Sequence, residues 1–225
     1  MNCKNFQKLQ FLEVPGYKIC RLKNMLIGLT GTYCSGKNYI AALLEGRGLP
    51  VLDADKLGYL ALETEKEAVF AQFGHDLKRA DGSLDRRLLG QRTFGKPEKL
   101  ASLEAIVHPP VDRLVSEWIE KKGDRAACCV INAALLHRSA VFKKLNRIIL
   151  VTAPFFTRIL RARRRDKLSW TEILQRFASQ KDFYPQYLSI NAEIYRVENP
   201  GLSGTQSLSK KLELRIDRFI KSLEC

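Results

Sequence analysis

The sequence predicts an α/β fold in which helices cover both faces of a parallel sheet. Apolar segments of strand length alternate with segments of helical periodicity from residue 25 to residue 223. A glycine-rich turn joins the first strand to the first helix, and an Asp-Ala-Asp sequence at 53–55 follows the second strand. Strands that alternate with helices favour parallel pairing, because each crossover helix returns the chain to the same edge of the sheet.

The elements are expected in a regular order along the chain. Strands are predicted at 26–29, 50–52, 127–132, 147–151 and 194–197, and helices at 37–45, 154–165, 170–180 and 203–223. Residues 56–122 are predicted to be mostly helical, with breaks at Asp81-Gly82 and Pro109-Pro110. Residues 1–24 carry five basic residues and one acidic residue. They are expected to form an N-terminal extension that is either flexible or not native, with Met25 as the natural start.

The composition is that of a folded protein with a basic surface. The chain has 225 residues, of which 45% are hydrophobic and 28% are charged, and its formal net charge is +14. The apolar segments are shorter than the roughly 20 residues that cross a membrane, and the first residues do not resemble a signal peptide, so a cytoplasmic protein without a membrane partner is expected. The six cysteines form no Cys-x-x-Cys pair, which argues against a zinc site. The positive charge favours anionic ligands such as nucleotides or nucleic acid.

The glycine-rich turn has the spacing of a phosphate-binding loop. Its sequence matches G-x-x-x-x-G-K and ends in Asn where Ser or Thr is usual: Gly31, Thr32, Tyr33, Cys34, Ser35, Gly36, Lys37 and Asn38. The glycines let the backbone wrap closely, so that N–H groups face the phosphates of ATP. Lys37 can reach the β- and γ-phosphates, and the following helix adds its positive end. A strand–helix turn with an unrelated lysine is the alternative.

Asn38 and Cys34 are the unusual members of this loop. The usual hydroxyl is a ligand of Mg²⁺, and the carboxamide oxygen of Asn38 is also a neutral, hard ligand. Asn38 is therefore expected either to bind Mg²⁺, directly or through water, or to mark a site that has lost its metal. Cys34 lies near a helix N-terminus, a position that can lower the pKa of a thiol.

Asp53 and Asp55 lie at the carboxyl end of a predicted strand, where α/β sheets bind their ligands. Two residues apart on an extended chain, the carboxylates are expected to point to opposite sides and to have different roles. Asp55 is predicted to be the base that accepts a hydroxyl proton, and Asp53 to hold Mg²⁺ through water; the reverse assignment stays open. A helix cap is the alternative role for either residue.

Together with sequences further along the chain, these features resemble the dephospho-coenzyme A kinase family. The first strand and the phosphate loop of that family correspond here to LIGLTGTYCSGKN, and its Asp-x-Asp strand to VLDAD. The resemblance covers about residues 25–222. It continues in ADGSLDR from Ala80, LEAIVHP from Leu103, Leu135-Leu136, and Arg161 and Arg165-Asp166 with Gln180.

The resemblance implies a P-loop NTPase-type three-layer fold with a five-stranded parallel sheet. It implies phosphoryl transfer from ATP, with Mg²⁺, to the ribose 3′-hydroxyl of dephospho-CoA. The nucleotide-binding core would comprise residues 25–57, 123–155 and 188–225, with a helical acceptor domain at 58–122 and a lid at 156–187. A monomer or a weak homo-oligomer without a stable nucleic-acid partner is expected.

The resemblance also implies roles for single residues outside the loop. Arg161 and Arg165 would close over ATP, with Arg165 neutralising charge on the transferred group, and Tyr39 would adjoin the nucleotide. Dephospho-CoA would be bound by Asp55, Arg86, His108 and Leu135. An exposed helix arginine is the alternative for Arg86, and a histidine that ends a helix before Pro109-Pro110 is the alternative for His108.

The chain departs from the family pattern near the predicted site. Asn38 replaces Ser or Thr, the family's Pro-Leu-Leu-Phe-Glu reads Ala134-Leu135-Leu136-His137-Arg138, Arg158 replaces Gln, and Glu193 replaces Asp. Two alternatives therefore stay open. One is another P-loop kinase for a small alcohol or a nucleoside monophosphate, and the other is a nucleotide- or RNA-binding relative without full turnover.

Overall fold

A computed structural model describes most of the chain from Met25 onward. The described residues are 13–14, 17–18, 25–93, 95–123, 128–166, 169–180, 183–188, 191–201 and 206–223. Most of the predicted extension 1–24 lies outside them, as do residues 167–168 and 181–182 of the predicted lid. Within 1–24, β1 (Glu13–Val14) pairs with β2 (Tyr17–Lys18) in antiparallel orientation.

The predicted parallel sheet is confirmed, with five strands in the order β4-β5-β3-β6-β7. These are β3 (Met25–Gly31), β4 (Val51–Asp53), β5 (Cys128–Asn132), β6 (Arg147–Thr152) and β7 (Glu193–Glu198). The three central strands are buried almost throughout, whereas the edge strands β4 and β7 are partly exposed. Continuous apolar runs are typical of parallel strands that are covered on both faces.

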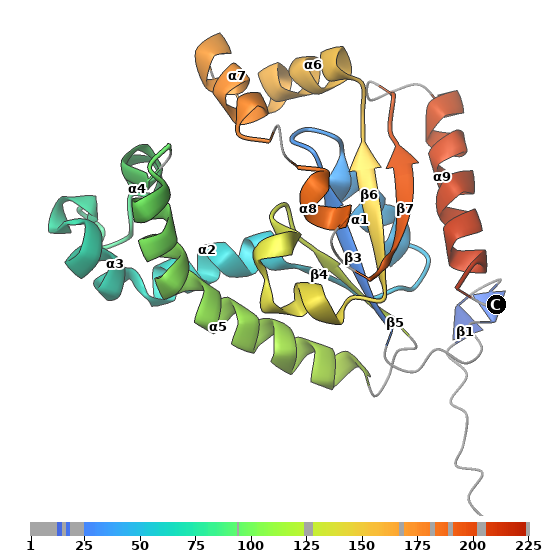
Figure 1. Ribbon diagram of the computed structural model, residues 1–225, viewed down its shortest axis with the longest axis horizontal. Coiled ribbons are helices and arrows are strands. Elements are labelled where there is room, and N and C mark those ends of the chain that lie inside the picture. Colours follow the sequence, from blue (N-terminus) through green and yellow to red (C-terminus); the bar gives the residue numbers. More distant parts are fainter. Residues whose placement is uncertain are drawn as a thin grey trace, which may run out of the picture.

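Helices cover the two faces of this sheet, as Figure 1 shows. Successive strand residues point to opposite faces, so Leu29 packs on α1 (Lys37–Glu45) and α9 (Gln206–Lys221), and Leu26 packs on the other side. That second face is covered by the C-terminal half of α5 (Pro97–Gly123), by the short helices η2 (Leu136–Arg138) and η3 (Ala140–Lys144), and by α8 (Pro185–Leu188).

A helical lobe lies beside the sheet and has a small apolar core of its own (Figure 1). It contains α2 (Ala54–Thr64), α3 (Lys66–Phe73), η1 (His75–Leu77), α4 (Arg86–Thr93) and the first half of α5. Its buried core residues are Val69, Phe70, Leu77, Leu84 and Leu89. The predicted interruption at Asp81-Gly82 is confirmed, because that turn separates η1 from α4.

The predicted break at Pro109-Pro110 is wrong, since α5 continues through both prolines. Each proline removes a backbone donor and costs a helix interior about 3 kcal/mol. Packing offsets this cost: Ile106 before the prolines packs on the core of the lobe, and Val115 after them packs on the sheet. The alternative role for His108, that of ending a helix before the prolines, is wrong for the same reason.

Two further helices lie above the carboxyl end of the sheet (Figure 1). They are α6 (Phe155–Asp166) and α7 (Trp170–Ala178), and their inner residues Ala162 and Ile173 pack on Cys34 of the glycine-rich loop. Ser169 caps α7, and Glu172 completes a reciprocal capping box. Among the helices that the structure describes, none is long and apolar enough to cross a membrane.

Candidate active site

The loop between β3 and α1 has the geometry of an anion-binding cradle. Gly36 has a φ of 90°, which favours glycine, and an added side chain there would collide with Asn199. Gly36 is also the N-cap of α1, with no side-chain cap and no acidic residue in the first turn. The N–H groups and the positive helix end are therefore free of competing carboxylates and can receive phosphate oxygens.

Two buried hydroxyls of the loop fit a polyphosphate ligand. The Oγ1 atom of Thr32 and the Oγ atom of Ser35 are buried, and each lacks a hydrogen-bond partner among the described residues. Buried hydroxyls in native proteins normally have partners, so these atoms indicate a polar group that completes the site.

Arg161 holds the loop from outside, through contacts that its place in the sequence did not predict. Its Nη1 donates to the carbonyl oxygens of Cys34 (3.3 Å) and Ser35 (3.0 Å). Its Nη2 donates to Asn199 Oδ1 (3.0 Å) and to the carbonyl of Gly201. Asn199 Nδ2 in turn donates to the Ser35 carbonyl at 2.9 Å. Arg161 thus braces the loop backbone in this structure.

Replacing Arg161 with alanine is expected to lower both stability and ATP affinity, because the carbonyls of the loop lose a charged donor. We expect the free energy of unfolding to fall by about 2–3 kcal/mol, measured by urea denaturation. Arg164→Ala, at an exposed position on the same helix, is the matched control and should change little. Equal unfolding free energies for the two variants would contradict the bracing role.

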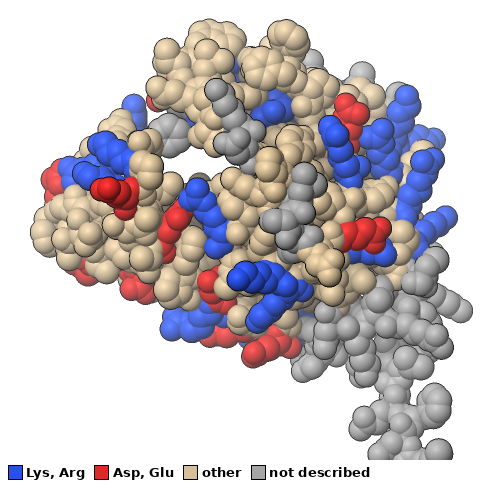
Figure 2. All heavy atoms as spheres, viewed as in Figure 1, with Lys and Arg blue, Asp and Glu red and all other residues tan. Residues whose placement is uncertain are grey.

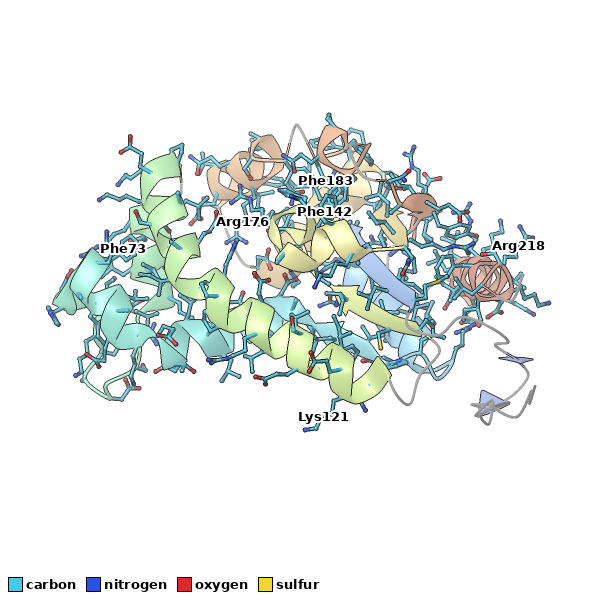
Figure 3. All side chains as sticks on the ribbon, turned by 60° about the horizontal axis from the view of Figure 1, so that its bottom comes forward. Phe73, Lys121, Phe142, Arg176, Phe183 and Arg218 are labelled. Atoms are coloured by element: carbon cyan, nitrogen blue, oxygen red, sulfur yellow. The ribbon has the colours of Figure 1, made fainter. Side chains whose placement is uncertain are left out.

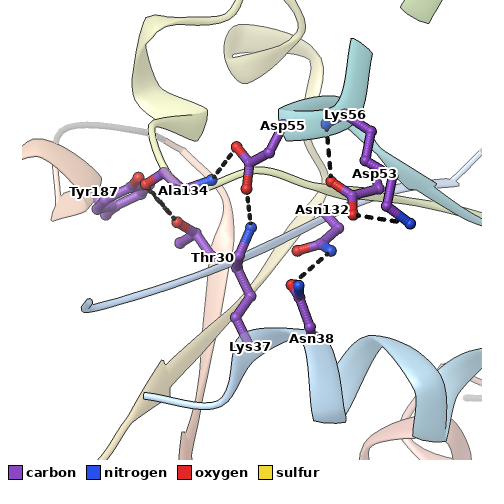
Figure 4. A network of polar contacts seen from close by, with 9 residues as sticks. All are labelled: Thr30, Lys37, Asn38, Asp53, Asp55, Lys56, Asn132, Ala134 and Tyr187. Carbon is purple, nitrogen blue, oxygen red and sulfur yellow. Dashed lines mark hydrogen bonds and ion pairs between the residues drawn. The ribbon is translucent and has the colours of Figure 1, made fainter. Parts of the chain in front are cut away.

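Lys37 and Asp55 meet at the carboxyl end of the sheet (Figure 4). Lys37 Nζ lies 2.6 Å from Asp55 Oδ2, and the backbone N–H of Ala134 donates to Asp55 Oδ1 at 3.0 Å. Asp55 lies in the first turn of α2 rather than on extended chain, which corrects the sequence-based geometry. Asp53 ends β4 and caps α2 by accepting from the backbone N–H of Lys56 (3.3 Å). The two carboxylates thus have different partners.

Asn38 faces a second polar residue that the sequence analysis missed, Asn132 at the end of β5 (Figure 4). Asn132 Nδ2 donates to Asn38 Oδ1 at 3.3 Å, while Asn132 Oδ1 is buried and lacks a partner among the described residues. Asn132 is also the register partner of Asp53 on β4. The signal in the sequence was a polar residue that ends an otherwise apolar strand.

The end of α6 is tied to the tip of the loop. Arg165 donates to Asp166 through Nε (2.5 Å) and Nη2 (3.0 Å), and its guanidinium lies over the Tyr33 ring, 5.5 Å from the centroid. The Tyr33 hydroxyl donates to Asp166, and the Tyr33 backbone N–H donates to Gln180 Oε1 at 2.6 Å. Burial and the Asp166 hydrogen bond raise the pKa of Tyr33 to about 12.

The Cys34 thiol, in the same cluster, has a raised pKa. Desolvation by burial is the largest cause, and it outweighs the nearby Arg165 charge, which acts in the opposite direction. The general effect of a helix N-terminus on a thiol is thus outweighed here by burial. Cys34 stays a thiol at neutral pH and packs against Ala162 and Ile173.

The carboxyl of Asp166 is expected to make stability depend on acid pH. The hydrogen bond from Arg165 is the main cause that lowers the Asp166 pKa, ahead of the one from Tyr33. The stabilisation is therefore complete at a pH above the pKa of an unfolded aspartate, about 3.9. It is lost as the pH falls through the lower pKa that Asp166 has in the folded protein. Urea denaturation should give a higher free energy of unfolding for wild type than for Asp166→Asn at pH 7, and this difference should disappear below about pH 4. A difference in the free energy of unfolding that does not change with pH would contradict this prediction.

The remaining predicted residues lie in different parts of the molecule. Leu135 is exposed and follows Ala134 at the sheet edge. Arg86 is on α4, where its guanidinium lies over the Tyr59 ring, and His108 is in the middle of α5. Tyr39 is turned toward α9, and its hydroxyl lies 2.5 Å from Ser209 Oγ. The carboxyl end of the sheet thus carries five of the predicted residues, which are Lys37, Asn38, Asp53, Asp55 and Leu135. The helical lobe carries two, Arg86 and His108.

An open hollow lies between the helical lobe and the helices α6 and α7. Figure 2 shows it from one side, with Lys and Arg side chains on its rim. Arg138 of η2 pairs with Glu104 of α5 and so joins the sheet to the lobe. The site therefore has a phosphate loop on one side of this hollow and a helical lobe on the other.

Comparisons with known proteins identify the family of this chain. The family model described as dephospho-CoA kinase matches residues 25–186. The dephospho-CoA kinase of Treponema pallidum is 33% identical over 201 residues, which cover 86% of this chain and 94% of the relative. The dephospho-CoA kinase of Thermus thermophilus is 38% identical over 156 residues, covering 69% of this chain and 75% of the relative.

Two solved structures share this fold. A crystal structure from Thermus thermophilus has a TM-score of 0.71 and 33% identity, and the match covers 87% of this chain and 97% of that one. The dephospho-CoA kinase from Campylobacter jejuni, at 21% identity, shares the fold with a TM-score of 0.56 over 90% of this chain and 98% of its own. On these sequence matches and this fold, the chain belongs to the dephospho-CoA kinase family.

Proposed function

We propose that this protein transfers the γ-phosphoryl group of ATP to the ribose 3′-hydroxyl of dephospho-CoA. The observation that carries the proposal is the contact between Lys37 of the phosphate loop and Asp55 at the sheet edge, at 2.6 Å. A lysine that serves the donor and a carboxylate that serves the acceptor thus lie within one hydrogen bond of each other. Phosphoryl transfer requires such closeness, because the attacking and leaving oxygens must lie in line.

The donor phosphates would be held by the loop and by basic side chains. The backbone N–H groups of Thr32, Tyr33 and Ser35 already donate within the protein. Phosphate oxygens are therefore received by N–H groups at the N-terminal end of α1, at residues 36–38, and Lys37 binds the β- and γ-phosphates. Arg165 leaves Asp166 to neutralise charge that develops on the transferred group, as arginines do in related reactions. The two orphan hydroxyls, of Thr32 and Ser35, support a polyphosphate in this cradle.

Asp55 would act on the acceptor. With Lys37 drawn to the phosphates, Asp55 Oδ2 becomes free to accept a hydrogen bond from the 3′-hydroxyl and then its proton. The ribose oxygen forms a bond to the γ-phosphorus as the bond from that phosphorus to the β–γ bridging oxygen breaks. The products are ADP, coenzyme A and a proton on Asp55. Arg86 and His108 would contact the remainder of dephospho-CoA from the helical lobe, and Leu135 would contact it from the turn after β5.

A set of oxygen donors beside the loop fits Mg²⁺. Asn38 and Asn132 would offer amide oxygens to the ion, and Asp53 would hold it through water. The Asn132 Oδ1 atom, which lacks a partner among the described residues, is the observation that favours the site. Among the described residues no group of three or more His, Cys, Asp or Glu could hold a metal. When bound, Mg²⁺ would neutralise charge on the phosphates of ATP.

A panel of candidate acceptors tests the substrate. In thermal unfolding with ATP present, dephospho-CoA should raise Tm, whereas AMP, CMP and shikimate should not, because only a bound ligand stabilises the folded state. Stabilisation by one of the other acceptors would indicate a different kinase. If the protein instead bound RNA tightly, with a steep dependence on salt and without turnover, it would be a nucleotide- or RNA-binding relative of the kinases.

A further inference from the structure

Tyr187 is a buried tyrosine directly beneath the site, and its ring is held on several sides. It is fully buried, packs edge-on against Phe142 (5.6 Å between centroids) and His137 (5.5 Å), and lies tilted on Phe183 (5.0 Å). Figure 3 shows Phe142 and Phe183 beside each other on this side of the sheet. Burial raises the Tyr187 pKa, so the side chain keeps its O–H. The ring therefore presents a hydroxyl at a fixed place.

The hydroxyl of Tyr187 is part of a chain of hydrogen bonds with a defined direction. Thr30 Oγ1 donates to the carbonyl of Ala134 (3.3 Å), because a carbonyl can only accept. Thr30 therefore accepts from the Tyr187 hydroxyl, 3.2 Å away. Having used its proton, Tyr187 Oη accepts from His137 Nδ1, also at 3.2 Å. The order is His137 to Tyr187 to Thr30 to Ala134, with each group oriented by the one before it.

The chain of hydrogen bonds reaches Asp55 through Ala134 (Figure 4). The carbonyl of Ala134 accepts from Thr30, and the N–H of Ala134 donates to Asp55 Oδ1 at 3.0 Å. Ala134 lies just after β5 in a turn without helical or strand pairing of its own, and its neighbour Leu135 is exposed. Thr30 is fully buried in β3 and so ties this turn to the rigid centre of the sheet.

We infer that Thr30 and Tyr187 are positioning residues for phosphoryl transfer: they fix the Ala134 turn so that its N–H orients the Asp55 carboxylate toward the acceptor hydroxyl. This inference rests on the proposed role of Asp55. Neither residue touches the reacting atoms, so their loss should lower kcat and leave the KM for ATP unchanged. Displacing the base lowers kcat strongly, because a proton acceptor must lie within hydrogen-bond distance of the hydroxyl.

Conservative variants test this without emptying the core. Tyr187→Phe and Thr30→Val each remove one hydroxyl and keep the shape of the side chain. We expect each to lower kcat about 10-fold, and the double variant to lose little more than the worse single one, because both act on the same turn. Tyr195→Phe is the matched control, since its hydroxyl donates to the Arg215 carbonyl on α9. It should keep the wild-type kcat.

A second readout does not depend on turnover. Exchange of the Ala134 amide proton, followed by NMR, should be about 10-fold faster in Tyr187→Phe and Thr30→Val than in wild type or Tyr195→Phe. Unchanged exchange at Ala134 in both variants would overturn the inference, as would wild-type kcat in both. If wild type showed no activity with dephospho-CoA, the proposed function would fail, and the Ala134 exchange would still decide whether the two hydroxyls hold the turn.

Discussion

Lys37→Ala is expected to lower kcat by about 10³-fold with dephospho-CoA as acceptor. The side chain is the cation of the loop that reaches both phosphates and Asp55, so its removal takes away charge stabilisation where negative charge is transferred. ATP affinity should fall as well, because Lys37 also binds the ground state. ADP release under saturating ATP and acceptor measures the first effect, and calorimetric titration with ATP measures the second.

The control for Lys37→Ala removes a lysine of equal charge at a distant, exposed position. Lys211 on α9 serves this purpose, and Lys211→Ala should keep the wild-type rate and ATP affinity. If Lys37→Ala bound ATP and turned over normally, the assignment of residues 31–38 as a phosphate loop would be wrong.

Asp55→Asn is expected to lower kcat by about 10²–10⁴-fold with ATP affinity retained. The amide keeps the size of the side chain and can still accept from the Ala134 N–H, but it cannot take the proton of the acceptor hydroxyl. Because the loop is unaltered, calorimetric titration with ATP should give an affinity near that of wild type. A rate that is lost together with ATP binding would instead indicate damage to the nucleotide site.

The matched control is Asp217→Asn, which removes a carboxylate that pairs with Arg47, beyond the C-terminal end of α1 and so at the opposite end of that helix from the phosphate loop. Its rate should equal that of wild type, since partly exposed ion pairs contribute little to the fold and none to the reaction. Full turnover by Asp55→Asn would show that the base lies elsewhere, with Asp53 as the next candidate.

The fold could be predicted from local patterns, because buried parallel strands are continuous apolar runs. The predicted strand at 147–151 corresponds to β6 (Arg147–Thr152), and the predicted helix at 37–45 is α1. The failure at Pro109-Pro110 has a physical cause: the local cost of two prolines is outweighed by packing against two cores, which no local pattern encodes. Most predicted ends differ by one or two residues from those of the structure, a difference that is common at the ends of helices and strands.

The site could be predicted only where side chains follow a motif. Lys37 and Asp55 come from a loop and from a strand end, and parallel strands bring such ends to one edge of the sheet. The Ala134 N–H, the Tyr187 hydroxyl and the bracing by Arg161 have no such signal. Each depends on backbone groups or on residues more than 70 positions apart in the sequence, such as Ala134 and Asp55. Only the fold brings such residues together.

The most direct measurement is ADP release from ATP by the purified protein in the presence of Mg²⁺, with and without dephospho-CoA. We predict release that depends on the acceptor, at about 1–100 turnovers per second, the usual range of kinases. Such a rate would also show that Asn38 serves in place of the usual hydroxyl. A protein that binds ATP yet releases no ADP when dephospho-CoA is added would contradict the proposed phosphoryl transfer.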